Sequence, residues 1–198
     1  MEMDMKRYEK NLGLIGIEGQ KILHSSRIAI VGAGGLGGTV FEIMLRYGVG
    51  HIKIIDFDSF EETNLNRQIL SSVTNIGEKK VEAAKKRAAL INPDTQVEAT
   101  CEKISDTNAK DILSGYDVAI DCLGNIKDRF VLERAAKALG TPFVHAAVAG
   151  HTGQITSIFP EDTGLSAIYG DEKSAPKSGE EISVGTPPST VMTIASMQ

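Results

Sequence analysis

Hydrophobic positions along the chain follow two patterns. Short uninterrupted runs of aliphatic residues predict buried strands, and longer stretches with an apolar residue every three or four positions predict helices. Strands that alternate with helices indicate βαβ units and a largely parallel sheet, which is an α/β fold. The predicted strands are residues 27–31, 52–55, 95–99, 117–120, 142–148 and 153–159. The predicted helices are residues 4–24, 36–47, 78–91 and 126–139, a short one between the third and fourth strands, and a final one that begins at Pro187-Pro188.

The length of 198 residues favours a single domain over residues 1–198. Within it, residues 1–25 form an N-terminal helical segment that glycines interrupt. Residues 161–185 are rich in Gly, Ser, Pro, Lys and Glu, and we expect a mobile loop there. Ligands of parallel sheets bind beyond the carboxyl ends of the strands, so the residues that carry chemistry should follow the strands.

Composition and charge exclude several classes of protein. Hydrophobic residues make up 41% and charged residues 24%, as in ordinary globular proteins. The net charge of −5 argues against general binding to nucleic acids or anionic membranes, and the apolar runs are too short to cross a bilayer. Residues 1–10 are charged and hold no apolar signal segment, so we expect a cytoplasmic protein. Two cysteines, Cys101 and Cys122, are too few for a structural zinc site.

Five glycines gather within Gly32–Gly38, directly after the first predicted strand. Residues 32–37 match the motif G-x-G-x-x-G between a strand and a helix. Such glycines permit a tight turn and allow backbone N–H groups to approach a phosphate at the helix N-terminus. Asp56 ends the next strand, where a carboxylate accepts hydrogen bonds from ribose hydroxyls. These residues predict a nucleotide site; a tight turn without a ligand is the alternative.

Basic residues behind the second strand distinguish between nucleotides. The segment Thr63–Gln68 follows Asp56-Phe57-Asp58, and Lys80 lies at the start of the next helix. A triphosphate needs its charge neutralised before another anion attacks it, whereas NAD-binding folds have no general need for Arg and Lys here. Lys80 by itself is typical of a solvated helix lysine. Its spacing from Arg67 and from the glycine motif favours ATP.

Five separated sequence elements resemble, in order, the ThiF/MoeB/HesA family of ubiquitin-activating-like adenylyltransferases. The elements are GxGGLG, DFD, NLNRQ, IGxxKV and a strand that ends in Asp-Cys. The resemblance runs from Arg7-Tyr8 to the last residue, Gln198. It implies a Rossmann-like fold, with a mostly parallel twisted sheet, helices on both faces and antiparallel strands toward the C-terminus. It also implies that residues 161–185 form a crossover-type loop and that the final helix extends beyond Gln198.

The resemblance implies an ATP-dependent enzyme that activates a carboxylate as an acyl-adenylate and releases pyrophosphate. The acceptor would be the C-terminal glycine of a ubiquitin-like sulfur carrier or a small-molecule acid. ATP and Mg²⁺ would be the cofactors, and the enzyme would be a homodimer. Arg67 and Lys80 would be catalytic. The implied nucleotide-binding residues are Gly32, Gly34, Gly35, Gly37, Asp56, Asp58, Asn64, Arg67, Gln68, Lys80, Gly124 and Asn125.

Two departures from the family pattern concern the site. Gly124 stands where relatives carry the aspartate that binds Mg²⁺, so the metal ligands are left open, with Asp121 and Asp128 as substitutes through water. Lys10 stands where relatives carry an arginine that reaches into the partner subunit's site, and we assign Lys10 that role in trans. Arg7 is the alternative.

A third departure concerns cysteine, because residues 161–185 contain none, which excludes a thioester step there. Cys122 is interpreted as an inert core residue. His145 and His151 either contact the substrate or are structural. Two other functions stay open. Gly124 motivates a non-catalytic nucleotide-binding partner, and the glycine motif allows an NAD-dependent oxidoreductase.

Overall fold

The computed structural model describes residues 5–176 and 181–198, around a six-stranded sheet with the order β3-β2-β1-β4-β5-β6. The pairs β1–β2, β2–β3, β1–β4 and β4–β5 are parallel, and β6 runs antiparallel to β5. This confirms the predicted α/β fold with an antiparallel pair toward the C-terminus. The strands are β1 (Arg27–Val31), β2 (His51–Ile55), β3 (Gln96–Thr100), β4 (Val118–Asp121), β5 (Phe143–Ala149) and β6 (Thr152–Ile158).

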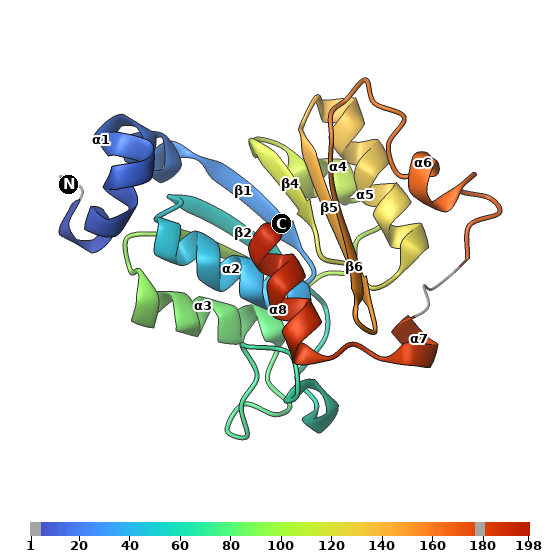
Figure 1. The fold of residues 1–198 in the computed structure, drawn as a ribbon, viewed down its shortest axis with the longest axis horizontal. Helices are drawn as coiled ribbons and strands as arrows, with labels where there is room; N and C mark the ends of the chain where they lie inside the picture. The colour runs from blue at the N-terminus through green and yellow to red at the C-terminus, as the bar shows by residue number, and fades with distance from the viewer. Residues whose placement is uncertain (1–4, 177–180) are drawn as a thin grey trace.

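Helices cover both faces of the sheet (Figure 1). α2 (Gly35–Tyr47), α3 (Lys80–Ile91) and α8 (Pro188–Met197) pack on one face. α4 (Ala109–Leu113) and α5 (Ile126–Leu139) pack on the other face. Among the described residues, no helix combines the length and the apolar character that a membrane span requires. The remaining elements are η1 (Met5–Tyr8), α1 (Glu9–Ser25), η2 (Glu62–Asn64), α6 (Ser166–Tyr169) and α7 (Glu181–Val184).

β1 has an uninterrupted apolar sequence because the sheet is buried on both sides. Ile28 and Ile30 belong to the core under α2, α3 and α8. Ala29 and Val31 belong to the core under α4 and α5. The strand therefore directs its C-terminal end, and the glycine motif behind it, to the edge where the parallel strands finish.

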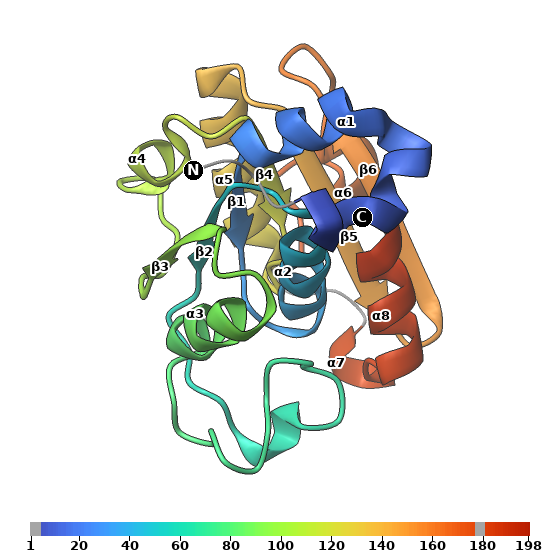
Figure 2. The ribbon, with the colours of Figure 1, turned by 90° about the vertical axis from the view of Figure 1, so that its left-hand side faces the viewer.

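Glycines set the bounds of several helices. α2 ends at Gly48 in the left-handed region (φ 82°), and α5 ends in the same way at Gly140 (φ 71°). α1 contains one of the predicted interruptions, since Gly16 has non-helical dihedrals (φ 67°, ψ 179°). Figure 2 shows the two arms of α1 on either side of this bend, beside the end of the sheet where β1 begins.

The segment 161–185 contains more regular structure than the sequence predicts. It includes α6 and α7, and Leu165 is completely buried against the core of α5. Leu165, Ile168 and Tyr169 have helical spacing, but Gly164 and Gly170 limit this pattern to one turn, so the sequence alone does not reveal that Leu165 is buried. Residues 177–180 lie outside the described part of the chain, and the mobility of the segment stays a prediction.

Glu42 connects α2 to α3 and carries a testable prediction. It is 6% exposed and accepts hydrogen bonds from Arg87 (2.9 Å) and Arg46 (3.0 Å). Burial acts to raise the pKa of Glu42, but these hydrogen bonds outweigh it, and the pKa lies below its ordinary value of 4.5. A lowered pKa in the folded protein stabilises the fold above the unfolded pKa, and this stabilisation is lost as the pH falls through the folded pKa.

Glu42→Gln is therefore expected to lower the free energy of unfolding by about 1–3 kcal/mol at neutral pH. The difference from the wild type should shrink in acid, as the wild-type carboxylate becomes protonated. Urea unfolding of both proteins at neutral and at acidic pH measures this difference in the free energy of unfolding. Glu18→Gln is the control, since Glu18 is 81% exposed in its ion pair with Lys21 and should have almost no effect. A constant difference across pH would contradict the prediction.

Candidate functional site

A cavity of about 430 Å³ opens at the carboxyl ends of β1, β2 and β4. Its volume lies in the range of small-molecule sites. The structure brings most of the predicted nucleotide-binding residues together in its lining, all except Gly37 and Asn64. The predicted residues in the lining are Gly32, Gly34, Gly35, Asp56, Asp58, Arg67, Gln68, Lys80, Gly124 and Asn125.

Three glycines of the motif, Gly32, Gly34 and Gly37, have different environments. Gly32 makes the turn after β1 with φ 101°, and a Cβ there would lie 2.5 Å from the carbonyl oxygen of Cys122. A Cβ on Gly37 would lie 1.7 Å from the carbonyl oxygen of Gly32, so Gly37 permits close packing of α2 on the turn. A Cβ on Gly34 would meet a single atom within 4 Å, Nε2 of Gln68 at 3.9 Å. The backbone at Gly34 is thus open to a ligand in the cavity.

Asp56 positions the glycine turn. One carboxylate oxygen accepts a hydrogen bond from the N–H of Ala33 (2.7 Å), and the other accepts one from the N–H of Asp58 (2.8 Å). A carboxylate offers about four lone-pair sites, so Asp56 retains capacity for ribose hydroxyls while it holds the turn.

Cationic and amide side chains that follow β2 in the chain form one part of the lining. Lys80 is buried, with 7% of its side chain exposed, and its Nζ lies 3.2 Å from a carboxylate oxygen of Asp58. Arg67 is half-buried, and its Nη1 donates to the carbonyl oxygen of Thr63 (3.0 Å). Gln68 is 6% exposed, and its Oε1 has no hydrogen-bond partner among the described residues. A buried amide oxygen without a partner is costly, so a ligand donor at this point would stabilise the site.

Asn64 lies outside the lining of the cavity. Its Oδ1 accepts a hydrogen bond from the N–H of Glu61 (3.1 Å), in a capping box that shapes the 3₁₀ turn η2. The role of Asn64 as a phosphate ligand stays a prediction.

The turn between β4 and α5 forms another part of the lining. Asn125 caps α5, because its Oδ1 accepts a hydrogen bond from the N–H of Lys127 (2.8 Å). A Cβ on Gly124 would meet nothing within 4 Å. Asp121 is completely buried outside the lining, and Asp128 lies in the lining with its Oδ2 3.7 Å from Nζ of Lys103. Over residues 5–176 and 181–198, no group of three His, Cys, Asp or Glu side chains is placed to hold a metal ion.

The sequence did not predict several residues of the lining. Lys103 follows β3, so the rule that ligands bind beyond strand ends could have found it. Arg129 lies one helical turn into α5, and Val191 lies on α8. A Cβ on Gly35 would lie 2.8 Å from Cγ1 of Val191. α8 therefore limits the space above the start of α2, although it is distant in sequence.

Lys10, Arg7 and His151 lie outside the lining of the cavity, whereas Cys122 is part of it. Lys10 is exposed on α1, which precedes β1, whereas the cavity lies beyond the C-terminal end of β1, so its role in trans stays a prediction. Arg7 already contacts Asn92 (2.5 Å) and Asp94 (2.7 Å) of its own chain. His151 is exposed. Burial raises the pKa of Cys122 well above its ordinary value, as expected for an inert core thiol.

The model of the ThiF family matches residues 8–198. The chain belongs to the ThiF family. One ThiF relative is the sulfur carrier protein adenylyltransferase of Thermus thermophilus, 36% identical over 77% of this chain and 57% of its own length. Another is the SAMP-activating enzyme E1 of Haloferax volcanii, 33% identical over 79% of this chain and 59% of its own length. The chain thus spans somewhat more than half the length of these two relatives.

A solved structure with the same fold is the tRNA N6-threonylcarbamoyladenosine dehydratase of E. coli in complex with ATP. Its TM-score is 0.80 at 20% identity, over 98% of this chain and 92% of that chain. At this identity the likeness shows the ThiF fold alone.

Proposed function

We propose that this chain activates a carboxylate by adenylation with ATP. The observation that carries the proposal is the cavity where the open backbone of Gly34, the carboxylate of Asp56 and the cations Arg67 and Lys80 meet. The two adenylyltransferase and activating relatives named above support it. An NAD site would leave Arg67 and Lys80 without a role.

In the proposed reaction, a carboxylate oxygen attacks the α-phosphorus of ATP. A bond forms between that oxygen and the phosphorus, and the bond from the phosphorus to the bridging oxygen breaks, so pyrophosphate leaves with the electron pair. Both reactants are anions, so catalysis consists mainly of positioning and charge neutralisation. Lys80 stabilises the charge at the α-phosphate, Arg67 and Gln68 hold the phosphates, and Asp56 binds the ribose.

The proposed acceptor is the C-terminal glycine of a ubiquitin-like sulfur carrier, or a small-molecule acid. The relatives' names support the first of these. We further propose a homodimer in which Lys10 of each subunit reaches the partner's site. ATP is the proposed cofactor, and the low cysteine count leaves no role for zinc.

Magnesium enters this proposal as the counter-ion of the triphosphate. Position 124 has no side-chain donor, Asp58 is paired with Lys80, and Asp128 faces Lys103. These residues do not form a metal site by themselves, so no step is assigned to a protein-bound metal.

Gly124→Asp is expected to make ATP binding depend on magnesium. The added side chain has open space, and its carboxylate would repel the triphosphate without a cation and share a cation when Mg²⁺ is present. The ratio of ATP affinities with and without Mg²⁺ should rise by about tenfold, or roughly 1.4 kcal/mol. Calorimetry measures it, with Gly124→Asn as a control of equal size without charge. The same ratio in both variants would contradict the placement of position 124 near the phosphates.

The function is tested by ATP binding and by pyrophosphate release. ATP, and not NAD, should raise the melting temperature, because a ligand that binds only the folded state stabilises it. Candidate carboxylates, including small proteins that end in Gly-Gly, should then trigger pyrophosphate release. A rise of the melting temperature with NAD but not with ATP would support an oxidoreductase. ATP binding without release, with every acceptor tried, would support a non-catalytic nucleotide-binding partner.

A further inference from the structure

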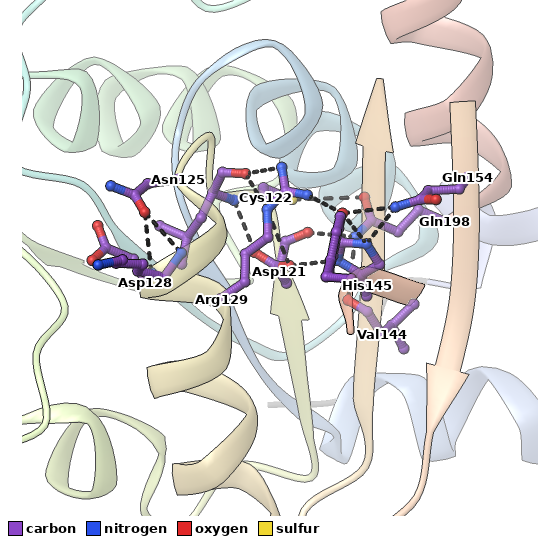
Figure 3. Close-up of polar contacts among 12 residues, drawn as sticks. Asp121, Cys122, Asn125, Asp128, Arg129, Val144, His145, Gln154 and Gln198 are labelled. Carbon is purple, nitrogen blue, oxygen red and sulfur yellow. Dashed lines mark hydrogen bonds and ion pairs between the residues drawn. The ribbon is translucent and has the colours of Figure 1, made fainter. Parts of the chain in front are cut away.

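A buried polar cluster lies behind the Leu123–Asn125 turn of the cavity (Figure 3). Asp121 and His145 are completely buried, and Arg129 is 5% exposed. Figure 3 shows Arg129 and His145 on opposite sides of Asp121, with Gln154 of β6 on the side of His145 away from Asp121. The proposed reaction uses neither this cluster nor Tyr169, the residue of α6 that completes it.

The hydrogen bonds of the cluster connect the side chains of Asp121, His145, Tyr169, Gln154 and Arg129. Asp121 accepts from Nδ1–H of His145 (2.7 Å), and Nε2 of His145 lies 3.3 Å from Nε2 of Gln154. The hydroxyl of Tyr169 accepts from Nη1 of Arg129 (2.6 Å) and from Nε2 of Gln154 (2.7 Å). Its own hydrogen is then directed to Nε2 of His145 (3.1 Å). Every group has a partner when the Tyr169 phenol is neutral, and burial raises the pKa of Tyr169 above its ordinary value.

Arg129 links this hydroxyl to the cavity. Its Nε donates to the carbonyl oxygen of Leu123 (3.0 Å), and its Nη2 donates to the same oxygen (2.5 Å). The N–H of Leu123 donates to Asp121 (2.9 Å). One guanidinium therefore contacts both the hydroxyl of Tyr169 and the turn that carries Gly124 and Asn125 in the lining.

Tyr169 belongs to a stretch that packs along α5, residues 162–172, which we call the docked segment. Glu133 accepts a hydrogen bond from the N–H of Leu165 (2.9 Å). Lys137 donates to the carbonyl oxygen of Asp162 (2.7 Å), and Arg134 forms an ion pair with Glu172. α5 thus carries the docked segment along its length, while its first turn and the preceding residues line the cavity.

We propose that Tyr169 is a positioning residue that couples the docked segment to the nucleotide cavity. Its hydroxyl orients Arg129, and Arg129 holds the Leu123–Asn125 turn in the conformation that receives the nucleotide. Coupling between two sites is reciprocal, so a bound nucleotide stabilises the docked segment to the same extent as the docked segment favours nucleotide binding. This inference rests on the proposed function, because it takes an adenine nucleotide as the ligand.

Tyr169→Phe removes the hydroxyl and leaves Arg129, Gln154 and His145 each without one hydrogen-bond partner. Calorimetry with ATP should show an affinity about fivefold or more below the wild type. Tyr116→Phe is the matched control. Tyr116 is 8% exposed, precedes β4 and lies outside the cavity lining. The control removes its hydroxyl, which donates to Glu98 (2.9 Å). ATP affinity should not change in the control.

Hydrogen exchange separates positioning from a general loss of stability. In the wild type, saturating ATP should slow amide exchange in α6 by about fivefold or more. In Tyr169→Phe at saturating ATP, this protection should disappear. The wild-type measurement needs no variant, so it tests the coupling even where Tyr169→Phe does not fold.

The outcomes distinguish the two proposals. Absence of ATP binding to the wild type overturns the proposed function and the coupling together. ATP binding to the wild type with no change of exchange in α6 overturns the coupling alone. The coupling is also overturned if Tyr169→Phe keeps both the wild-type affinity and the ATP-dependent protection.

Discussion

Replacement of Lys80 by alanine is expected to slow ATP-dependent pyrophosphate release by about 10²–10³-fold, or roughly 3–4 kcal/mol of transition-state stabilisation. Lys80 is a buried cation of the cavity, and solvent screens its charge less than that of the half-buried Arg67. The variant should still fold, because the partner of Lys80, Asp58, has 48% of its side chain exposed and can be solvated.

The measurement compares initial rates of pyrophosphate release at saturating ATP and acceptor. Lys86→Ala is the control. It removes the same side chain from the same helix at a position with 73% exposure, where Lys86 pairs with Glu78. A rate for Lys80→Ala within about threefold of the wild type, a difference of less than 1 kcal/mol, would show that Lys80 does not act on the reacting phosphate.

Two alanine substitutions in the glycine motif are expected to affect different properties, one the stability of the fold and the other the affinity for ATP. Gly37→Ala places a methyl group 1.7 Å from the backbone oxygen of Gly32, and no side-chain movement can relieve this contact. α2 would have to move away from β1, with a loss of stability of about 3 kcal/mol or more. Gly34→Ala places a methyl group in open space, 3.9 Å from Nε2 of Gln68, so the fold should persist.

Gly34→Ala should nevertheless lower ATP affinity by about tenfold or more, because the methyl group occupies the approach of the phosphates to the backbone. Denaturant unfolding and calorimetry on both variants measure the two effects, and each variant is the control for the other. Unchanged ATP affinity in Gly34→Ala would show that no ligand approaches this backbone. Wild-type stability in Gly37→Ala would contradict the packing argument.

Much of the fold and part of the site followed from local sequence. The strands and helices were predictable because buried strands and amphipathic helices produce their own periodicities. Asp56 and the glycine motif were predictable because they stand at strand ends, and parallel strands finish at one edge of a sheet. Lys103 could have been included by the same rule, since it follows β3.

Other features depend on contacts between distant segments. Val191 limits the space above Gly35 only because α8 packs against α2. No periodicity in the neighbouring residues records such a contact, because the two partners are set by how the helices pack.

The sequence by itself determined the α/β fold, the glycine turn and the basic residues that follow the second strand, since each depends on neighbours in the chain. Only the tertiary structure decided that Asp121 pairs with His145 and Arg129 and that Leu165 is buried. It alone also decided that the hydroxyl of Tyr169 contacts Arg129 in the buried polar cluster. The physical reason is burial: a polar side chain removed from water must find its partners in space, and those partners come from five separate elements of the fold.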